Sequence, residues 1–219
     1  FLSIPMAHQM STLFTILDGT KNKQMLKVMR PYQVYATKAV LNELKRADFD
    51  LPINKLGYVW HTTGSGKTIT SFKTAWLASR MPNVDKVIFV VDRIALTKQT
   101  EDNYKAYDPE GSIDDGGKEY NNVSGTQNTD ALENKLSKSG YGIIVTSVQK
   151  LNTLIKRKNF VVPKKKFVFI VDEAHRSTGG ESFEELQKAF KGAAWVGYTG
   201  TPMFDEVVGK KGTKTHEVF

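Results

Sequence analysis

The sequence predicts an α/β fold in which helices cover both faces of a doubly wound, mostly parallel sheet. Three observations lead to this prediction. Apolar, β-branched runs alternate with segments of helical periodicity over most of the chain. The runs at residues 87–91 and 167–171 are continuously apolar, as strands buried on both faces of a parallel sheet are. A glycine-rich turn, residues 64–66, joins one strand to the helix that follows it.

The first third of the chain contains two expected helices and one strand. Residues 1–27 are predicted to form a helical or irregular lead-in, broken at Asp18-Gly19. A helix is expected to begin at Arg30-Pro31-Tyr32-Gln33, because proline suits a first helical turn and apolar residues follow at helical spacing. A strand over residues 56–60 then leads through the glycine-rich turn into a helix that reaches residue 78.

Strands and helices continue to alternate after this turn. Residues 108–128 are rich in Gly, Asp, Asn and Ser, and we expect a long loop there. The remaining strands are expected at residues 87–91, 142–146, 167–171 and 194–198, and the helices at 94–104, 130–138, 148–156 and 181–190. Ligands of such a sheet bind at the carboxyl ends of its strands, so the polar residues that follow the strands are the candidates for a site.

Composition limits the class of protein. The chain has 219 residues, enough for one sizeable domain with an extension, and it begins at Phe1, so we expect a piece of a longer protein. No apolar stretch is long enough to span a membrane, and the start lacks the features of a signal peptide. The absence of cysteine excludes disulfides and thiolate metal sites and is compatible with the cytoplasm, our expected location.

The net charge of +8 and the pI near 9.4 favour a polyanionic partner. The alternative is a basic surface with no such partner. Much of the excess charge lies at residues 156–158, 164–166 and 210–211, in expected loops and element ends where solvated runs are common.

Residues 61–68, His-Thr-Thr-Gly-Ser-Gly-Lys-Thr, have the pattern of a phosphate-binding loop. Glycines allow successive backbone N–H groups to face an anion at a helix N-terminus. We expect the lysine to reach the β- and γ-phosphates of ATP and the last hydroxyl to bind Mg²⁺. The expected nucleotide-binding residues are Thr63, Gly64, Ser65, Gly66, Lys67 and Thr68. His61 replaces the first glycine of the general pattern, and the alternative is a turn with a solvated lysine.

Acidic residues follow the predicted strand at 167–171. Asp172 is expected to hold Mg²⁺, and Glu173 is expected to act as the general base that polarises the attacking water. With Lys67 they form the predicted catalytic set. The alternative is that both residues only favour the dipole of a following helix.

Together, residues 61–68 and Asp172-Glu173-Ala174-His175 resemble motifs I and II of the superfamily-two helicases and translocases. In that superfamily the first glycine of the loop is often replaced. Thr199-Gly200-Thr201-Pro202 resembles motif III, which couples hydrolysis to movement. Gln33 resembles the glutamine that reads adenine, although a helical glutamine is often merely solvated.

Among these families, the chain resembles the R (restriction, motor) subunit of type I restriction enzymes over about residues 28–219. Five segments carry this resemblance: Arg30-Pro31-Tyr32-Gln33 with Ala36 and Ala39, residues 61–68, Val91-Asp92-Arg93 with Leu96 and Gln99, residues 172–177, and residues 197–202.

The resemblance implies the first RecA-like lobe of an ATP-dependent motor that pulls double-stranded DNA, in a subunit of a site-specific deoxyribonuclease. It also implies methylation and specificity subunits as partners. We find no nuclease motif before the motor and no room for the second lobe, so residues 1–27 are expected to be a linker from the nuclease domain. The isolated lobe is expected to bind ATP weakly and hydrolyse it poorly.

Contacts with the DNA backbone are expected from residues that follow two strands. Arg93 follows one strand, and Thr146, Ser147 and Gln149 follow another. The alternatives are a surface ion pair for Arg93 and a helix N-cap for Thr146-Ser147.

His175 is expected to bond to Thr199 or Thr201 and so couple hydrolysis to motif III; the alternative is an ordinary loop histidine. Two rival functions remain for the whole chain. One is another superfamily-two DNA or RNA helicase lobe, and the other is a nucleotide-binding regulatory module that does not hydrolyse ATP. Glu173 argues against the second rival, because a module that only binds does not need a general base.

Overall fold

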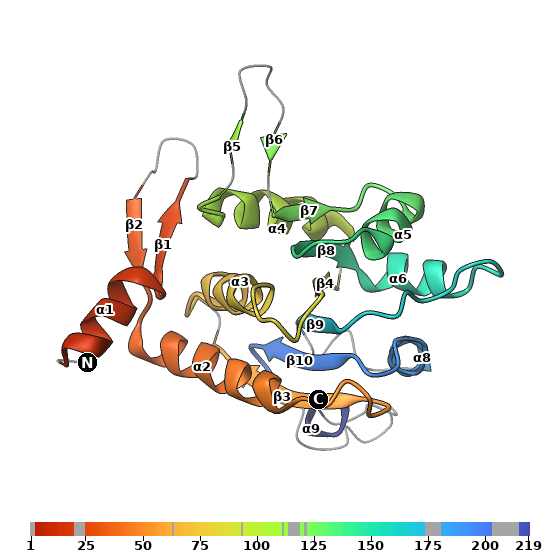
Figure 1. The fold of residues 1–219 in the computed structure, drawn as a ribbon, viewed down its shortest axis with the longest axis horizontal. Helices are drawn as coiled ribbons and strands as arrows, with labels where there is room; N and C mark the ends of the chain where they lie inside the picture. Colours follow the sequence, from red (N-terminus) through yellow and green to blue (C-terminus); the bar gives the residue numbers. More distant parts are fainter. Residues whose placement is uncertain are drawn as a thin grey trace.

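The computed structural model describes residues 3–19, 25–62, 64–92, 94–110, 112–113, 119–120, 122–173, 181–202 and 215–219. Six parallel strands form a central sheet in the order β3-β10-β9-β4-β8-β7 (Figure 1). Their bounds are β3 Asn54–Trp60, β10 Ala194–Thr199, β9 Phe167–Asp172, β4 Lys86–Val91, β8 Ile143–Ser147 and β7 Val123–Gly125. The predicted doubly wound α/β fold is confirmed.

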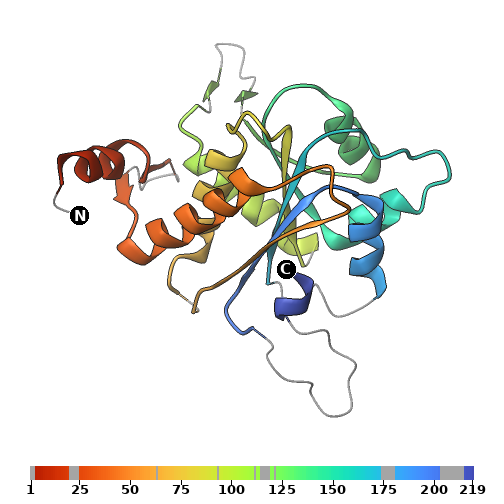
Figure 2. The ribbon, with the colours of Figure 1, turned by 60° about the horizontal axis from the view of Figure 1, so that its bottom comes forward.

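Helices cover both faces of this sheet, as Figures 1 and 2 show. One face carries α2 (Pro31–Arg46), α3 (Lys67–Ala78) and α4 (Ile94–Tyr107). The other carries α5 (Thr129–Ser137), α6 (Val148–Ile155), α8 (Glu181–Ala189) and the short α9 (Thr215–Val218). Each of the long helices on these faces except α2 follows a strand of the central sheet, which is the connection that parallel strands require.

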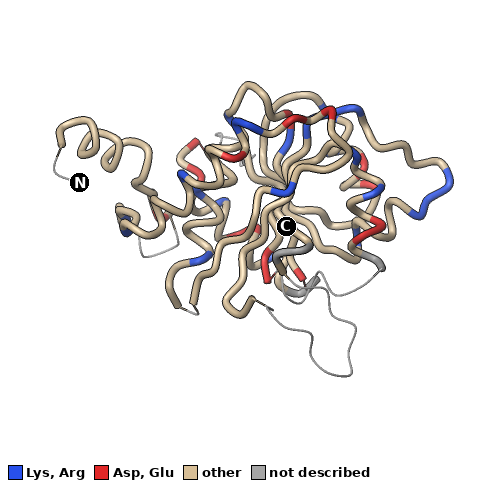
Figure 3. Tube along the Cα trace, turned by 90° about the horizontal axis from the view of Figure 1, so that it is seen from below, with Lys and Arg blue, Asp and Glu red and all other residues tan. Residues whose placement is uncertain are grey.

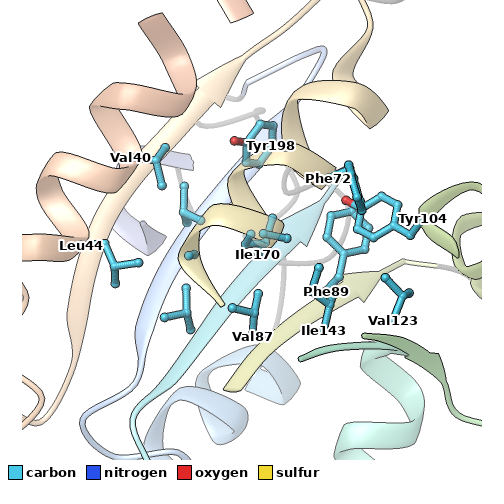
Figure 4. Packing of buried hydrophobic residues seen from close by; sticks show 14 of the residues in the cluster. Val40, Leu44, Phe72, Val87, Phe89, Tyr104, Val123, Ile143, Ile170 and Tyr198 are labelled. Atoms are coloured by element: carbon cyan, nitrogen blue, oxygen red, sulfur yellow. The ribbon is translucent and has the colours of Figure 1, made fainter. Parts of the chain in front are cut away.

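Two hydrophobic cores result from the alternation of side chains along the strands. In β4, Val87, Phe89 and Val91 belong to the core under α2, α3 and α4, while Ile88 and Val90 belong to the core on the opposite face. Figure 4 shows the first of these cores, in which side chains from α2, α3 and α4 meet those of the sheet. Because both faces are covered, the strands consist of almost continuous apolar runs.

Strand β3 lies at one edge of the sheet, and among the described strands it pairs with β10 alone. The register between them shifts, because Trp195 pairs with Lys55 whereas Gly197 pairs with Tyr58. Strand β3 therefore has one extra residue here, and Gly57 supports this bulge with a φ of 94°. The phosphate-loop candidate follows directly after this edge strand.

The N-terminal segment differs from the prediction. Helix α1 (Ile4–Thr12) buries no residue and projects away from the sheet (Figure 2), but β1 (Thr15–Asp18) and β2 (Met25–Val28) form an antiparallel hairpin. The expectation of a helical or irregular segment was wrong for these two strands. Ile16 lies in the first core, and Lys73 of α3 donates to the carbonyl of Thr15 at 3.1 Å. The hairpin is thus attached to the lobe by packing and by hydrogen bonds.

The expected loop at residues 108–128 also contains strands. Strand β7 extends the sheet beyond β8, and β5 (Ser112–Ile113) pairs with β6 (Glu119–Tyr120). Strands of two or three residues are too short to show a periodic pattern, which is why the sequence did not reveal them. Within the described part of the chain, no helix is both long and apolar enough to cross a membrane.

Candidate nucleotide-binding site

The glycine-rich loop connects β3 to α3 at the carboxyl edge of the sheet. The His61 N–H donates to the Thr199 carbonyl at 2.9 Å, which continues the pairing of β3 with β10 into the loop. Gly64 and Gly66 adopt left-handed conformations, with φ of 79° and 83°, and Gly66 is the N-cap of α3. This conformation favours glycine, which explains the Gly-x-Gly spacing. The loop thus leads directly into the N-terminus of a helix, where anions bind.

His61, at the position where the general pattern has glycine, stabilises the loop. Its side chain is 5% exposed, and its Nδ1 lies 3.0 Å from the Ser65 hydroxyl, which donates to the Thr62 carbonyl at 2.7 Å. Burial lowers the pKa of His61, and the charge of Lys67 lowers it further. At neutral pH the imidazole is therefore neutral. The general pattern has a flexible glycine at this position. Here a hydrogen bond of the buried histidine holds the loop in shape instead.

The three predicted catalytic residues come together. The Lys67 ammonium lies 3.4 Å from Asp172 Oδ1 and also forms a hydrogen-bonded ion pair with Glu173. Burial raises the pKa of the Asp172 carboxyl; Lys67 opposes this shift and Glu173 adds to it. These side chains come from the end of β9, from the residue that follows it and from the start of α3, so they join segments that are distant in sequence. The arrangement places one cation between two carboxylates at the carboxyl edge of the sheet.

Glu173 has a strained backbone. Its φ of 49° makes it the one non-glycine residue with positive φ among those the structure describes. A side chain in the left-handed region costs about 1–2 kcal/mol. Such strain clusters at functional sites, where the surrounding structure imposes it. Here it lies immediately after β9, at the residue whose carboxylate meets Lys67.

Gln33 braces the loop. Its side chain is 5% exposed, and its Nε2 donates to the carbonyls of Ser65 at 3.1 Å and Gly66 at 3.3 Å. Its Oε1 accepts the N–H of Arg30 at 2.8 Å, which caps α2. Both N–H groups of the amide are therefore used within the protein. The reading of adenine by Gln33 stays a prediction, and it requires at least one of these bonds to exchange.

A pocket of about 490 Å³ lies beside the loop and was not predicted from the sequence. Tyr32 and Trp60 line it together with Arg30 and loop residues. The Tyr32 hydroxyl donates to the Ser65 carbonyl at 2.6 Å, and the exposed Trp60 donates through Nε1 to the Gly200 carbonyl at 3.1 Å. The volume lies within the range of small-molecule sites. The sequence did offer one indication of this pocket, because Tyr32 and Trp60 each lie next to a residue motif that was assigned to nucleotide binding.

The remaining predicted nucleotide-binding residues are placed as follows. Thr68, the second residue of α3, is exposed, and Gly64 has no atom within 4 Å of where its Cβ would be. A hydroxyl and two carboxylates supply the oxygen ligands that Mg²⁺ prefers, so the residues present fit this ion. Thr63 lies outside the described residues. The roles of these residues stay predictions.

The predicted coupling residues are described in part. Thr199 is buried, and its Oγ1 accepts the N–H of Thr201 at 3.2 Å. His175 lies outside the described residues, so its bond to either threonine stays a prediction. The structure adds another link, because the hydroxyl of Tyr198 lies 2.7 Å from that of Thr74 in α3. Strand β10 therefore contacts the helix of the phosphate loop through a buried pair of hydroxyls.

The residues predicted to contact DNA differ in exposure. Thr146 is buried and accepts a hydrogen bond from the Thr126 hydroxyl at 3.0 Å. Ser147 is buried and caps α6 by accepting the Lys150 N–H at 3.4 Å, so the N-cap alternative is confirmed for Ser147. Gln149 is exposed and donates to the Asp92 carbonyl at 2.9 Å. Arg93 lies outside the described residues, and contact of all four with DNA stays a prediction.

The basic run at residues 156–158 is partly engaged in local ion pairs. Figure 3 shows basic residues along the segment between α6 and β9. Within it, Arg157 pairs with Asp130 and Glu133, and Lys156 lies 3.3 Å from Glu185. These contacts favour a local structural role for residues 156–158. The run at residues 210–211 lies outside the described residues.

The parallel sheet, the glycine-rich loop at a helix N-terminus and the lysine between two carboxylates define the class: a RecA-like ATPase lobe with a phosphate-binding loop. Residues 32–219 match the SWI2/SNF2 ATPase family, and the chain belongs to this family. The expectation drawn from the motifs, a superfamily-two motor lobe, is confirmed.

Two curated relatives show which kind of protein within this family the chain resembles. The chain is 36% identical over 214 residues to the type I restriction enzyme SsaAORF53P endonuclease subunit of Staphylococcus saprophyticus, covering 96% of this chain and 21% of that protein. It is 39% identical over 175 residues to the C-terminal part of a putative type I restriction enzyme MpnIIP endonuclease subunit of Mycoplasma pneumoniae, covering 75% of this chain and 80% of that protein. The chain thus spans about a fifth of the longer relative and is an ATPase motor lobe of the type I restriction enzyme kind.

Solved structures agree on the fold. The nuclease-deletion mutant of the Type ISP restriction-modification enzyme LlaGI, in complex with a DNA substrate mimic, matches 85% of this chain and 19% of that chain at 22% identity, with a TM-score of 0.54. The Sulfolobus solfataricus SWI2/SNF2 ATPase core in complex with dsDNA matches 80% of this chain and 32% of that chain at 16% identity, with a TM-score of 0.53.

Proposed function

We propose that this lobe binds ATP with Mg²⁺ and, within a longer restriction subunit, couples ATP hydrolysis to translocation of double-stranded DNA. Cleavage would be performed by a nuclease domain outside this chain, for which residues 1–27 would provide the linker. The observation that carries the proposal is the position of Lys67 between Asp172 and Glu173, directly after a glycine-rich loop. An ammonium and two carboxylates at the carboxyl edge of a parallel sheet, where such folds bind their ligands, support this proposal.

The electrostatics of this cluster suggest an exchange of partners. In the structure, Lys67 offsets one of two negative charges. When phosphates enter the loop, we propose that Lys67 turns to them and leaves Asp172 and Glu173 without their cation. Asp172 and the Thr68 hydroxyl would then hold Mg²⁺, which neutralises charge on the phosphates. Glu173 would accept a proton from the attacking water.

Partners are proposed from the relatives. Two solved structures with this fold are described as DNA complexes, and the curated relatives are endonuclease subunits of type I restriction enzymes. We therefore propose double-stranded DNA as the substrate of movement, with methylation and specificity subunits as partners. The net charge of +8 is consistent with a polyanion.

The test is ATPase activity of the full-length protein with its partner subunits, on duplex DNA with or without a recognition site. We expect DNA-stimulated, site-dependent hydrolysis that is lost in Lys67→Ala and Glu173→Gln. Lys164→Ala, which removes an exposed lysine far along the chain from the loop, is the matched control and is expected to retain activity. Stimulation by any DNA or RNA without partners would instead favour a general helicase.

Absence of hydrolysis under all conditions would leave the nucleotide-binding module. Glu173→Gln separates this rival from the motor in a second way. The substitution is expected to preserve binding of a fluorescent ATP analogue, because the amide keeps the shape of the carboxylate, while abolishing hydrolysis. Equal ATPase rates for Glu173→Gln and the parent protein would refute the role assigned to Glu173.

A further inference from the structure

A second pocket, of about 280 Å³, lies at the amino-terminal edge of the sheet. It is formed by the first residues of β4 and β8, by β7 and by the end of α5. Lys86, Lys135 and Lys138 line it, together with the hydroxyl residues Ser124 and Ser139. At about 3.3 Å per residue, the strand that begins at Lys86 separates this pocket from the carboxyl edge by roughly 16 Å. The pocket is therefore distinct from the phosphate loop.

Lys86 is the unusual member of this group. Its side chain is 7% exposed, yet among the described residues its ammonium forms no hydrogen bond and no ion pair. Burial lowers the pKa of Lys86, and the positive charge of Lys165 lowers it further, against the opposing effect of Asp85. Most of the Lys86 side chain is thus buried, but its ammonium is not fully enclosed and reaches the space of the pocket. Lys86 lines a pocket that can admit a partner.

The surroundings reinforce the positive charge. Burial also lowers the pKa of Lys135, with Lys105 and Lys138 adding to the effect and Glu101 opposing it. The Glu101 carboxylate pairs with Lys105 at 2.9 Å.

The other charged side chains near Lys86, those of Asp85 and Lys165, form hydrogen bonds with backbone groups. Asp85 accepts the backbone N–H of Lys166 at 2.7 Å. Lys165 donates to three carbonyls at the end of α5, at 2.6 to 2.9 Å, and so stabilises that helix end. Near the pocket, the acidic side chains are those of Asp85 and Glu101. They are outnumbered by the lysines of β4, α4, α5 and the segment before β9. The pocket has an excess of positive charge, with its most buried cation inside.

We propose that this pocket binds a phosphate group, with Lys86 as its central cation and Lys135 and Lys138 beside it. Lys86 and Lys138 line the pocket from separate elements, and Lys135, whose ammonium donates to the Gly125 carbonyl, adds its positive charge. Such a group of cations suits an anion with several acceptor oxygens. The hydroxyls of Ser124 and Ser139 add neutral donors. The phosphate group belongs either to a nucleic-acid backbone or to a free small phosphate, and both offer the same oxygens.

The test uses the full chain with Lys67→Ala, which removes the ammonium of the nucleotide loop. Inorganic phosphate and pyrophosphate are titrated by calorimetry, and a short fluorescein-labelled duplex is titrated by fluorescence anisotropy. Two variants alter the pocket, Lys86→Met and Lys135→Gln. Lys164→Gln removes the same charge from an exposed position outside the pocket and serves as the control. Thermal melting of each variant verifies that it is folded.

The expected result is a dissociation constant for pyrophosphate that rises about tenfold or more in Lys86→Met and also rises in Lys135→Gln, but not in Lys164→Gln. A parallel loss of duplex affinity identifies a nucleic-acid backbone as the source, and unchanged duplex affinity identifies a free phosphate. The proposal is overturned if neither phosphate binds at millimolar concentration, or if both pocket variants bind as well as the control. Because methionine keeps the apolar part of the largely buried Lys86 side chain, and the ammonium has no partner among the described residues, the melting temperature of Lys86→Met is not expected to fall.

Discussion

Gly66 is the residue at which a single added carbon is expected to disturb the phosphate loop most. Its φ is 83°, so an alanine there costs about 1–2 kcal/mol in backbone strain. A Cβ at this position lies 2.5 Å from Nε2 of Gln33, so the amide has to move away. Gln33 then loses its bonds to Ser65 and Gly66, each worth about 1 kcal/mol. We expect Gly66→Ala to lower the free energy of unfolding by about 3–4 kcal/mol.

Gly64 provides a matched control within the same loop. Its φ of 79° imposes the same backbone cost, but no atom lies within 4 Å of its Cβ position. Gly64→Ala is therefore expected to cost only about 1–2 kcal/mol. The difference between the two variants isolates the contact with Gln33. Urea denaturation followed by circular dichroism measures both values.

A double-mutant cycle tests the cause directly. In a Gln33→Ala background the contact is absent, so Gly66→Ala is expected to cost no more than Gly64→Ala does. The coupling energy between positions 33 and 66 is then about 2 kcal/mol. Equal costs for the two glycine variants in the parent chain, or a coupling energy near zero, would refute the bracing role of Gln33.

Two further perturbations are predicted. Tyr198→Phe removes a buried hydroxyl from its 2.7 Å bond with Thr74 and is expected to lower the free energy of unfolding by about 1–2 kcal/mol, measured by urea denaturation; no change would show that the bond contributes nothing. Burial, aided by Arg80, lowers the pKa of Lys73 to about 8, so the folded state loses this proton before the unfolded state does. Its contribution to stability therefore rises between pH 8 and about 10.5. Lys73→Met is expected to reduce that rise, and an unchanged pH profile would contradict the assignment.

Much of the fold was predictable because the buried strands are long and apolar. Strands such as β4 and β9 have core residues on both faces, so their sequences contain no polar interruption. The hairpin β1–β2 and the edge strand β7 escaped prediction for the opposite reason. They are four residues long or shorter, and their pairing is determined by distant segments.

The site was predictable where residues act through their position at strand ends. Lys67, Asp172 and Glu173 could be expected to meet because the carboxyl ends of parallel strands share one edge. The role of Gln33 could not be predicted, since its amide is directed by the carbonyl groups of a folded loop. Lys86 gave no signal either: a lysine at the start of a strand is usually exposed, and only the order of strands in the sheet buries it.

The edge position of β3 determines how mechanical load reaches the phosphate loop. A strand inside a sheet is held by two neighbours, but β3 is held by β10 alone among the described strands. Load on Thr199 and Gly200 passes to β3 through the parallel pairing of β10 with β3, through the 2.9 Å backbone bond from His61 to Thr199, and through the 3.1 Å bond from Trp60 Nε1 to the Gly200 carbonyl. No strand among the described residues pairs with the opposite edge of β3. We therefore expect a displacement of β10 to be transmitted to the phosphate loop, which follows β3 directly and is itself bonded to β10 through His61.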